Sequence, residues 1–183
     1  MNPSFRQRLA LRYLTSGVIA HPTDTIYGLA CLANNLFAVS QLIQLKRRDN
    51  AKGLILLASD IGYVAPYIDS TFISDLVDGV QMAKNQPTTF LVPTDSNTST
   101  LLTGGGPLIA VRITDNPLVR YFCKSAGSAL VSTSANVQGQ KTATSLLQLQ
   151  SYFNNGLSFA LAPTQYNNQA STIINLLTGE RIR

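Results

Sequence analysis

The chain has 183 residues, of which 45% are hydrophobic and 13% are charged, and its formal net charge is +5. This balance predicts one globular domain, residues 1–183, and excludes a disordered chain. It contains no apolar run long enough to cross a bilayer and no signal-peptide pattern, so we expect no membrane partner. Two cysteines are too few for a disulfide framework or a zinc site, which favours a reduced, cytoplasmic protein.

The first third of the chain predicts a helix, a strand and a second helix. Apolar residues recur at helical spacing from Phe5 to Val18, and this helix ends near Ser16 and Gly17. A strand over residues 17–20 follows, and Pro22, which has no N–H, ends its pairing. We interpret Gly28 as a tight bend after a polar loop. Asn34 and Asn35 precede a helix over residues 36–46, and either amide can cap it.

The middle and end of the chain continue the alternation of strands and helices. Continuous apolar or β-branched runs predict strands at residues 53–57, 89–92, 108–113, 129–131, 159–161 and 172–175, with a last short one at 181–183. Helical patterns cover residues 61–68, 74–84, 116–125 and 146–153, and a loop covers 95–103. The class is therefore α/β with a mixed sheet, in which ligands bind at strand ends.

A polar segment, Ser132-Thr133-Ser134-Ala135-Asn136, follows the strand at residues 129–131. It offers hydroxyls, an amide and closely spaced backbone N–H groups, which suit a nucleotide phosphate. Alternatively, it is a Ser/Thr/Asn turn that satisfies its own backbone.

The positive charge favours anionic partners such as ATP or RNA, but only Lys46-Arg47-Arg48 forms a run of cations. Lys46 and Arg48 can face one cleft if the chain leaves the helix between them, and Lys52 adds a third cation. Arg supplies a planar fork for phosphate and Lys a point charge. The alternative is a solvated helix end that the helix dipole favours.

Arg112 lies in an apolar strand, where a charge is seldom buried without a partner. It either pairs with an acid such as Asp24 or binds a ligand carboxylate. Thr23 and Thr25 flank Asp24 and either contact a small polar ligand or form a turn. His21, the only histidine, is interpreted as a strand-end residue rather than a catalytic base.

The glycine-rich stretch at residues 103–107 lacks the Lys-Ser/Thr of a P-loop, so we expect a flexible turn or the edge of a lid. The chain thus offers hydroxyls, amides and cations, but no convincing nucleophile. Such a set predicts electrostatic and positioning catalysis, as phosphate transfer to an incoming nucleophile requires.

Five motifs, in order, resemble the threonylcarbamoyl-AMP synthases of the YrdC/Sua5 family. They are Pro22-Thr23-Asp24-Thr25-Ile26-Tyr27-Gly28-Leu29, Leu45-Lys46-Arg47-Arg48, Ala110-Val111-Arg112-Ile113, Ser132-Thr133-Ser134-Ala135-Asn136 and Ser171-Thr172-Ile173-Ile174. The length resembles that of the short, single-domain bacterial form. The resemblance implies a single YrdC-like domain, with a twisted mixed sheet flanked by helices around a deep basic cleft.

The resemblance also implies an activity. The family makes L-threonylcarbamoyladenylate from ATP, L-threonine and bicarbonate and releases pyrophosphate, with Mg²⁺ accompanying ATP. Proteins of the threonylcarbamoyl-transferase complex then transfer the group to adenosine 37 of tRNA. A carbamate attacks the α-phosphate, so no nucleophile of the enzyme is needed.

The family pattern assigns roles to residues of this chain. Its catalytic signature corresponds to Lys46, Arg48, Ser134 and Asn136. The ATP site corresponds to Arg48, Lys52, Ser134, Thr142 and Arg181. The threonine site corresponds to Thr25, Arg112, Ser132 and Ser171, and no protein side chain is expected to hold a metal.

The chain departs from the family at a few positions. Lys84-Asn85-Gln86-Pro87 stands where the family often has Trp-Pro-Gly-Pro. Leu57 replaces a histidine of the threonine pocket, and Leu108 replaces a threonine near ATP. The sequence given stops at Arg181-Ile182-Arg183, without the family's usual continuation.

Two other functions compete with this one. A module that binds double-stranded RNA or tRNA without catalysis fits the net charge, although the aromatic residues are not interleaved with basic ones. A carbamoyl-transfer enzyme would use similar adenylate chemistry, but its family embeds this domain in a longer chain with zinc-finger-like cysteines.

Overall fold

The computed structural model describes residues 3–83, 86–163 and 170–182. Its helices are α1 (Phe5–Leu14), α2 (Leu36–Lys46), α3 (Ile73–Met82), α4 (Thr100–Thr103), α5 (Pro117–Ala126) and α6 (Leu146–Phe153). Its strands are β1 (Ile19–Pro22), β2 (Tyr27–Leu32), β3 (Ile55–Ala58), β4 (Thr88–Pro93), β5 (Leu108–Ile113), β6 (Leu130–Ser134), β7 (Phe159–Ala160) and β8 (Thr172–Asn175). Short 3₁₀ turns lie at Ile61–Tyr63, Ala65–Tyr67 and Ser70–Phe72. None of the described helices has the length and apolar character to span a membrane.

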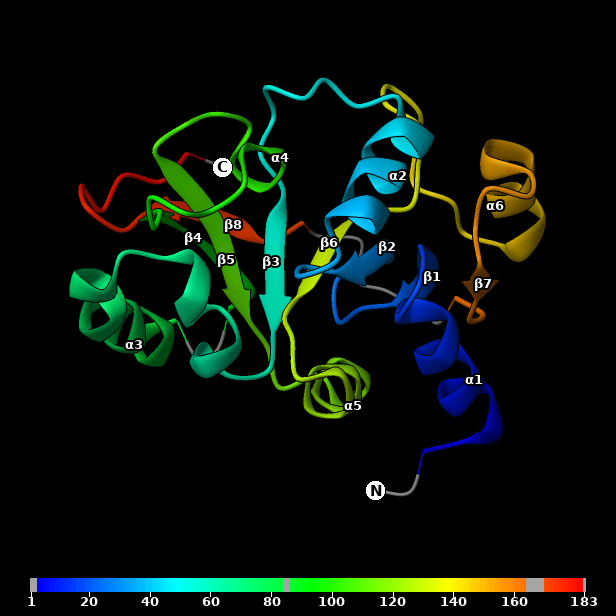
Figure 1. The fold of residues 1–183 in the computed structure, drawn as a ribbon, viewed down its shortest axis with the longest axis horizontal. Helices are drawn as coiled ribbons and strands as arrows, with labels where there is room; N and C mark the ends of the chain where they lie inside the picture. Colours follow the sequence, from blue (N-terminus) through cyan, green and yellow to red (C-terminus); the bar gives the residue numbers. More distant parts are fainter. Residues whose placement is uncertain (1–2, 84–85, 164–169, 183) are drawn as a thin grey trace.

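The strands form one mixed sheet in the order β7-β1-β2-β6-β3-β5-β4-β8 (Figure 1). β1 with β7, β3 with β5 and β4 with β8 are parallel pairs, and the other neighbours are antiparallel. Helix α2 packs on β2, α5 on β3 and α3 on β4. This arrangement confirms the predicted α/β class with a mixed sheet flanked by helices.

Two helices beside the central strands, α2 and α5, begin at asparagines that satisfy the first free backbone N–H groups. The Asn35 side chain accepts from the Ala38 N–H at the start of α2. The Asn116 side chain accepts from Leu118 and Val119 at the start of α5, where Pro117 is the first helical residue. Such caps stabilise a helix by about 1 kcal/mol each, which is why local sequence predicts these helices well.

The register of the central strands places small polar and apolar residues in one row. Ala30 pairs with Ser132, Ser132 with Ile55, and Ile55 with Ala110. Directly paired residues point to the same face of a sheet, so these four share a face. The residues next to them in the chain, such as Leu56 and Val111, point to the opposite face of the sheet and are fully buried in the hydrophobic core.

Two strand predictions were wrong around the polar motifs. Gly28 is not at a bend but within β2, where it pairs with His21 and Ser134. Ser132-Thr133-Ser134 is not a loop, because β6 continues through Ser134. β6 pairs with β2 over Leu130–Ser134 and with β3 over Leu130–Ser132, so backbone pairing extends the strand beyond the apolar run.

Smaller differences concern segments between strands. The predicted loop at residues 95–103 contains the helix α4, and the predicted helix at 61–68 is two 3₁₀ turns. Residues 181–183 form no strand in the described part, although Arg181 makes an isolated bridge to Ile174. Lys84, Asn85 and Arg183 lie outside the described residues.

Candidate active site

A cavity of about 590 Å³ lies over the central strands, with walls from β2, β3, β4, β5, β6 and the start of β8. Its polar lining consists of hydroxyl groups and two guanidinium groups: Thr23, Thr25, Thr103, Ser132, Thr133, Ser134, Thr142, Ser171, Arg48 and Arg112. Apolar side chains, among them Ile55, Leu57 and Leu108, complete it. No carboxylate belongs to the described lining. The cavity can therefore accept an anion together with a small polar molecule.

Most of the predicted site residues meet in this cavity. Thr25, Arg112, Ser132 and Ser171, predicted for threonine, all line it. Arg48, Ser134 and Thr142, predicted for ATP, line it as well. Leu57 and Leu108, two of the departures from the family, also line it. These two substitutions therefore change the surface of the same cavity.

Arg112 is held in place by two groups from the loop between β1 and β2. Its Nη2 lies 2.7 Å from Asp24 Oδ2, and its Nη1 donates to Thr25 Oγ1 at 3.0 Å. The Arg112 side chain is 8% exposed and that of Asp24 is 34% exposed. Burial lowers the pKa of Arg112, and Asp24 opposes this fall. Of the two interpretations of Arg112, the ion pair is confirmed, while the guanidinium still lines the cavity.

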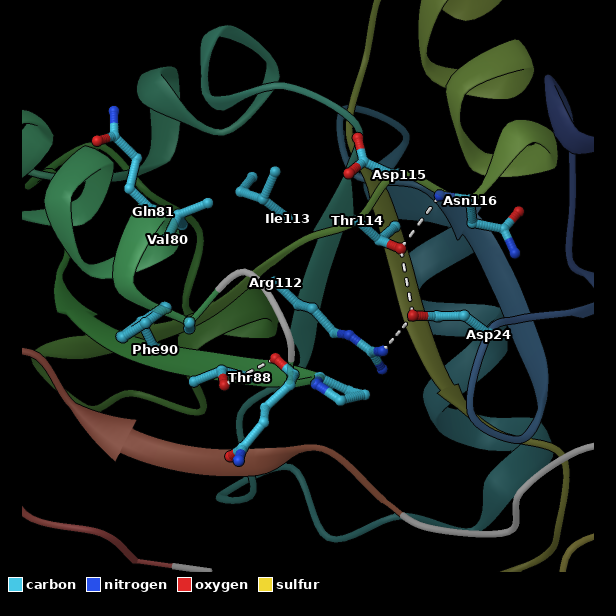
Figure 2. A pocket seen from close by; sticks show the side chains of 13 residues that line it. Asp24, Val80, Gln81, Thr88, Phe90, Arg112, Ile113, Thr114, Asp115 and Asn116 are labelled. Carbon is cyan, nitrogen blue, oxygen red and sulfur yellow. Dashed lines mark hydrogen bonds and ion pairs between the residues drawn. The ribbon is translucent and has the colours of Figure 1, made fainter.

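Asp24 is in turn tied to the beginning of α5 (Figure 2). Its Oδ2 accepts from Thr114 Oγ1 at 3.3 Å, and Thr114 Oγ1 accepts from the Asn116 N–H at 3.2 Å. A second cavity of about 490 Å³ lies on this side of the ion pair, and Phe90 and Val80 form part of its apolar wall. The Arg112–Asp24 pair therefore borders two cavities.

Thr23 and Thr25 have different structural roles: Thr23 closes a turn, and Thr25 contacts Arg112. Thr23 Oγ1 donates to the Ile26 carbonyl and accepts from the backbone N–H groups of Thr25 and Ile26. The turn interpretation is thus confirmed for Thr23. Thr25 Oγ1 lies 3.2 Å from Thr23 Oγ1 and accepts from Arg112, so Thr25 orients the guanidinium.

Lys46 differs from its prediction, because it does not face the cavity together with Arg48. It is the last residue of α2 and is 2% exposed. Its Nζ donates to the backbone carbonyls of Ser134 and Asn136 and to Asn136 Oδ1. Burial, and secondly Arg48, lower the pKa of Lys46 to about 7. Arg47 adopts a left-handed conformation with φ 49° and turns the chain, which separates the directions of the two cations.

Arg48 faces the cavity and is fixed by the segment that follows it. Its Nε donates to the Lys52 carbonyl at 3.1 Å and its Nη2 to the Gly53 carbonyl at 2.8 Å. Burial lowers the pKa of Arg48, and Asp49 opposes this fall. Lys52 is exposed and does not line the cavity, so its carbonyl, rather than its ammonium, contributes to this arrangement.

The remaining predicted residues lie outside the lining. Asn136 sits behind Ser134 and accepts from its hydroxyl. Arg181 is exposed, and its backbone forms an isolated antiparallel β-bridge with Ile174. Within the described residues, no group of three or more His, Cys, Asp or Glu side chains is placed to hold a metal.

The sequence did not point to Thr89 or Thr103. Thr89 Oγ1 lies 2.8 Å from Ser171 Oγ beside the cavity, and both residues are buried. Thr103 lines the cavity at the end of α4, where Gly104 with φ 70° reverses the chain. The glycine-rich stretch ends α4 at Thr103 and continues as a turn at residues 104–107, so of the expected turn or lid edge the turn is present. A threonine in a strand or just before glycine carries no signal that distinguishes it from an ordinary structural residue.

His21 lies inside β1 and is fully buried. Its Nδ1 lies 3.1 Å from the Pro22 carbonyl, and its Nε2 has no hydrogen-bond partner among the described residues. Burial lowers the pKa of His21 to about 4. His21 does not belong to the lining of the 590 Å³ cavity.

Comparisons with known proteins give the family. A family model for Sua5, YciO and YrdC, described as "Telomere recombination", matches residues 13–183. The threonylcarbamoyl-AMP synthase of Serratia proteamaculans is 41% identical over 169 residues, which cover 91% of this chain and 88% of that protein. Among solved structures, Sua5 of P. abyssi complexed with L-threonine is similar with a TM-score of 0.83 and 21% identity, covering 96% of this chain and 52% of that one. E. coli YciO is similar with a TM-score of 0.73 and 21% identity, covering 95% and 85%.

These two structures support the fold alone, whereas the sequence match covers nearly all of both proteins. The chain belongs to the Sua5/YciO/YrdC family.

Proposed function

We propose that this chain is a nucleotidyltransferase that makes L-threonylcarbamoyladenylate from ATP, L-threonine and bicarbonate and releases pyrophosphate. One observation carries the proposal: the Arg112 and Arg48 guanidinium groups line one cavity that is otherwise rich in hydroxyl groups. Arg is suited to a carboxylate or a phosphate because its planar fork forms paired hydrogen bonds. The curated relative that is 41% identical is named for this product.

The amino acid is assigned to the Arg112 end of the cavity. Asp24 and Thr25 each accept from one terminal nitrogen of Arg112, and the other N–H groups, from which no described residue accepts, are available for the threonine carboxylate. Thr25, Ser132 and Ser171 surround this position with hydroxyl groups. The threonine amine adds to bicarbonate, water leaves, and a carbamate forms.

The nucleotide is assigned to the Arg48 end, and Ser134 and Thr142 belong to the lining of the same cavity. A carbamate oxygen attacks the α-phosphorus of ATP, and the bond to pyrophosphate breaks. Arg48 stabilises the negative charge that shifts toward the leaving group. The step needs correct positioning and charge stabilisation, and no nucleophile of the protein.

Mg²⁺ is proposed to enter with ATP. It keeps phosphate oxygens and waters as most of its ligands, and hydroxyl oxygens line this cavity, so the donor set fits. Bound there, it would neutralise the pyrophosphate leaving group. The product would pass to partner proteins that modify tRNA, and the cytoplasm is the compartment that this activity predicts.

The test is a product assay with ATP, Mg²⁺, bicarbonate and L-threonine, in which mass spectrometry follows pyrophosphate and the adenylate. We expect product only when threonine and bicarbonate are both present. Arg48→Ala should lose most of the product while the fold survives, and Arg120→Ala, an exposed arginine of α5, is the control. Near-normal turnover by a folded Arg48→Ala protein would contradict the proposal, and RNA binding without turnover would favour a binding module.

A further inference from the structure

Lys46, Asn136 and Ser134 form a hydrogen-bonded cluster behind the nucleotide end of the cavity. Lys46 Nζ lies 2.5 Å from the Ser134 carbonyl, 2.7 Å from the Asn136 carbonyl and 3.1 Å from Asn136 Oδ1. A lysine ammonium has three N–H donors, and these three oxygens use all of them. Lys46 therefore has no N–H left for a bound phosphate.

The cluster requires the charged form of Lys46. A neutral amine has two N–H groups and would leave one of the three oxygens without a donor. Burial and the nearby Arg48 guanidinium act in the other direction and lower the pKa of Lys46. The three oxygen partners favour the ammonium, and burial and Arg48 oppose it.

The orientation of the Asn136 amide follows from its other contacts. Its Nδ2 donates to the Val137 carbonyl at 3.0 Å and to the Gln140 carbonyl at 2.7 Å. A rotated amide would place an oxygen against these two carbonyls and N–H groups against the ammonium. The network therefore fixes Oδ1 toward Lys46 and Ser134.

This orientation decides where the Ser134 proton points. Ser134 Oγ lies 2.5 Å from Asn136 Oδ1, and an amide oxygen can only accept. The single hydroxyl proton of Ser134 is directed at Asn136, while the lone pairs of Ser134 Oγ remain. Because Ser134 lines the cavity, it presents an acceptor there and not a donor.

We propose that Lys46 is a positioning residue: through Asn136 it holds the Ser134 hydroxyl proton out of the cavity, so that Ser134 accepts a hydrogen bond from ATP. The proposal rests on the proposed function, in which this end of the cavity binds ATP. The bound group is an N–H or O–H of the nucleotide, namely a ribose hydroxyl or the adenine amino group. Phosphate oxygens, which only accept, are left to Arg48.

The polarity of Ser134 is tested with nucleotides that each lack one donor: 2′-deoxy-ATP, 3′-deoxy-ATP and purine riboside triphosphate. Calorimetric affinities are measured with Mg²⁺ present and L-threonine omitted, so that no turnover occurs. We expect one analogue to bind the unmodified chain roughly three- to tenfold more weakly than ATP, the value of one hydrogen bond. That analogue and ATP should bind Ser134→Ala equally. Equal affinity of all four nucleotides for the unmodified chain, or the same weakening in Ser134→Ala, would overturn the proposal.

The role of Lys46 is tested by combining variants. Lys46→Met should lose the discrimination between ATP and that analogue, and adding Ser134→Ala should weaken ATP binding no further. A second, multiplicative loss in the double variant would mean that Lys46 contacts ATP itself. Lys124→Met, an exposed lysine of α5, is the control, and thermal unfolding verifies each fold. The Ser134 series decides the polarity even if Lys46→Met does not fold.

The two proposals fail in different ways. An unmodified chain that binds no ATP would overturn the proposed function and this inference together. Binding of ATP without discrimination among the analogues would overturn the inference alone.

Discussion

Asp24 determines how Arg112 faces the cavity, although Asp24 itself does not line it. Asp24→Asn keeps the shape of the side chain but removes the charge that holds Nη2. We expect the threonine concentration for half-maximal rate to rise about tenfold, equivalent to about 1.4 kcal/mol, with a smaller change in kcat. Steady-state kinetics with varied threonine measures both constants.

The matched control for Asp24→Asn is Asp115→Asn. Asp115 pairs with Arg120 at 3.0 Å, but both side chains are largely exposed, at 92% and 59%. Exposed pairs contribute little, so this variant should behave like the unmodified chain. An unchanged threonine dependence in folded Asp24→Asn would refute the positioning role of Asp24.

His21 makes the stability of the fold depend on pH. Its pKa is about 4 in the folded chain and 6.5 in the unfolded chain, so only the unfolded chain binds the proton between these values. Stability is therefore full above the unfolded pKa and is lost as pH falls toward the folded one. We expect His21 to account for a loss of about 2 kcal/mol from about pH 7.5 to about pH 5.

Urea unfolding at both pH values measures this loss, and His21→Leu removes the titrating group. The difference between the two proteins isolates His21, because the other titrating groups are common to both. If His21→Leu and the unmodified chain lose stability in parallel, the buried imidazole is not responsible.

Among the elements, the junction between α4 and β3 supports the nucleotide end of the cavity. Gly104 ends α4 with φ 70°, and a Cβ there would lie 2.6 Å from the Ala51 carbonyl oxygen and 2.8 Å from the Gly53 nitrogen. Residues 51–53 carry the carbonyls that hold Arg48. Gly104→Ala should therefore lower the free energy of unfolding by about 3 kcal/mol, because backbone strain and overpacking add together. It should also weaken ATP binding.

Gly105→Ala separates the two causes. Gly105 also has a positive φ, of 81°, but a Cβ there meets nothing within 4 Å. Gly105→Ala should lower the free energy of unfolding only by the backbone strain, about 1–2 kcal/mol, and should leave the ATP affinity unchanged. Chemical denaturation and calorimetry measure the two effects, and equal behaviour of the two variants would contradict the crowding argument.

Over the whole molecule, the cavity takes its walls from strands on both sides of the sheet's centre. A ligand that binds there binds only the folded chain. ATP and threonine at about a hundred times their dissociation constants should each add about 2.7 kcal/mol. For a chain of this size that raises Tm by about 5–10 °C, which differential scanning calorimetry measures.

The Tm shifts also separate the two ends of the cavity. Arg48→Ala should lose the shift with ATP and keep the shift with threonine, whereas Arg120→Ala should keep both. Loss of both shifts in Arg48→Ala would mean that the two ligands do not occupy separate ends.

Elements with strong local signals were predicted from the sequence to within a residue or two. The helices α2 and α6 follow from apolar spacing and, for α2, from the Asn35 cap. The strand β2 was missed because Gly28 suggests a bend. In the fold, Gly28 allows close approach, since a Cβ there would lie 3.3 Å from the Thr133 carbonyl oxygen. That reason involves a residue far along the chain and cannot be read locally.

The sequence by itself determined the α/β class, most helices and strands, the family, and the residue types of the site. It also offered the Arg112–Asp24 pair as one of two interpretations. Only the tertiary structure decided where the long side chains point. Lys46 and its partner Asn136 are 90 residues apart in the chain, and the strand order brings α2 and β6 together. A flexible four-carbon side chain can reach either solvent or a distant carbonyl, so its direction depends on which oxygens the folded sheet places around it.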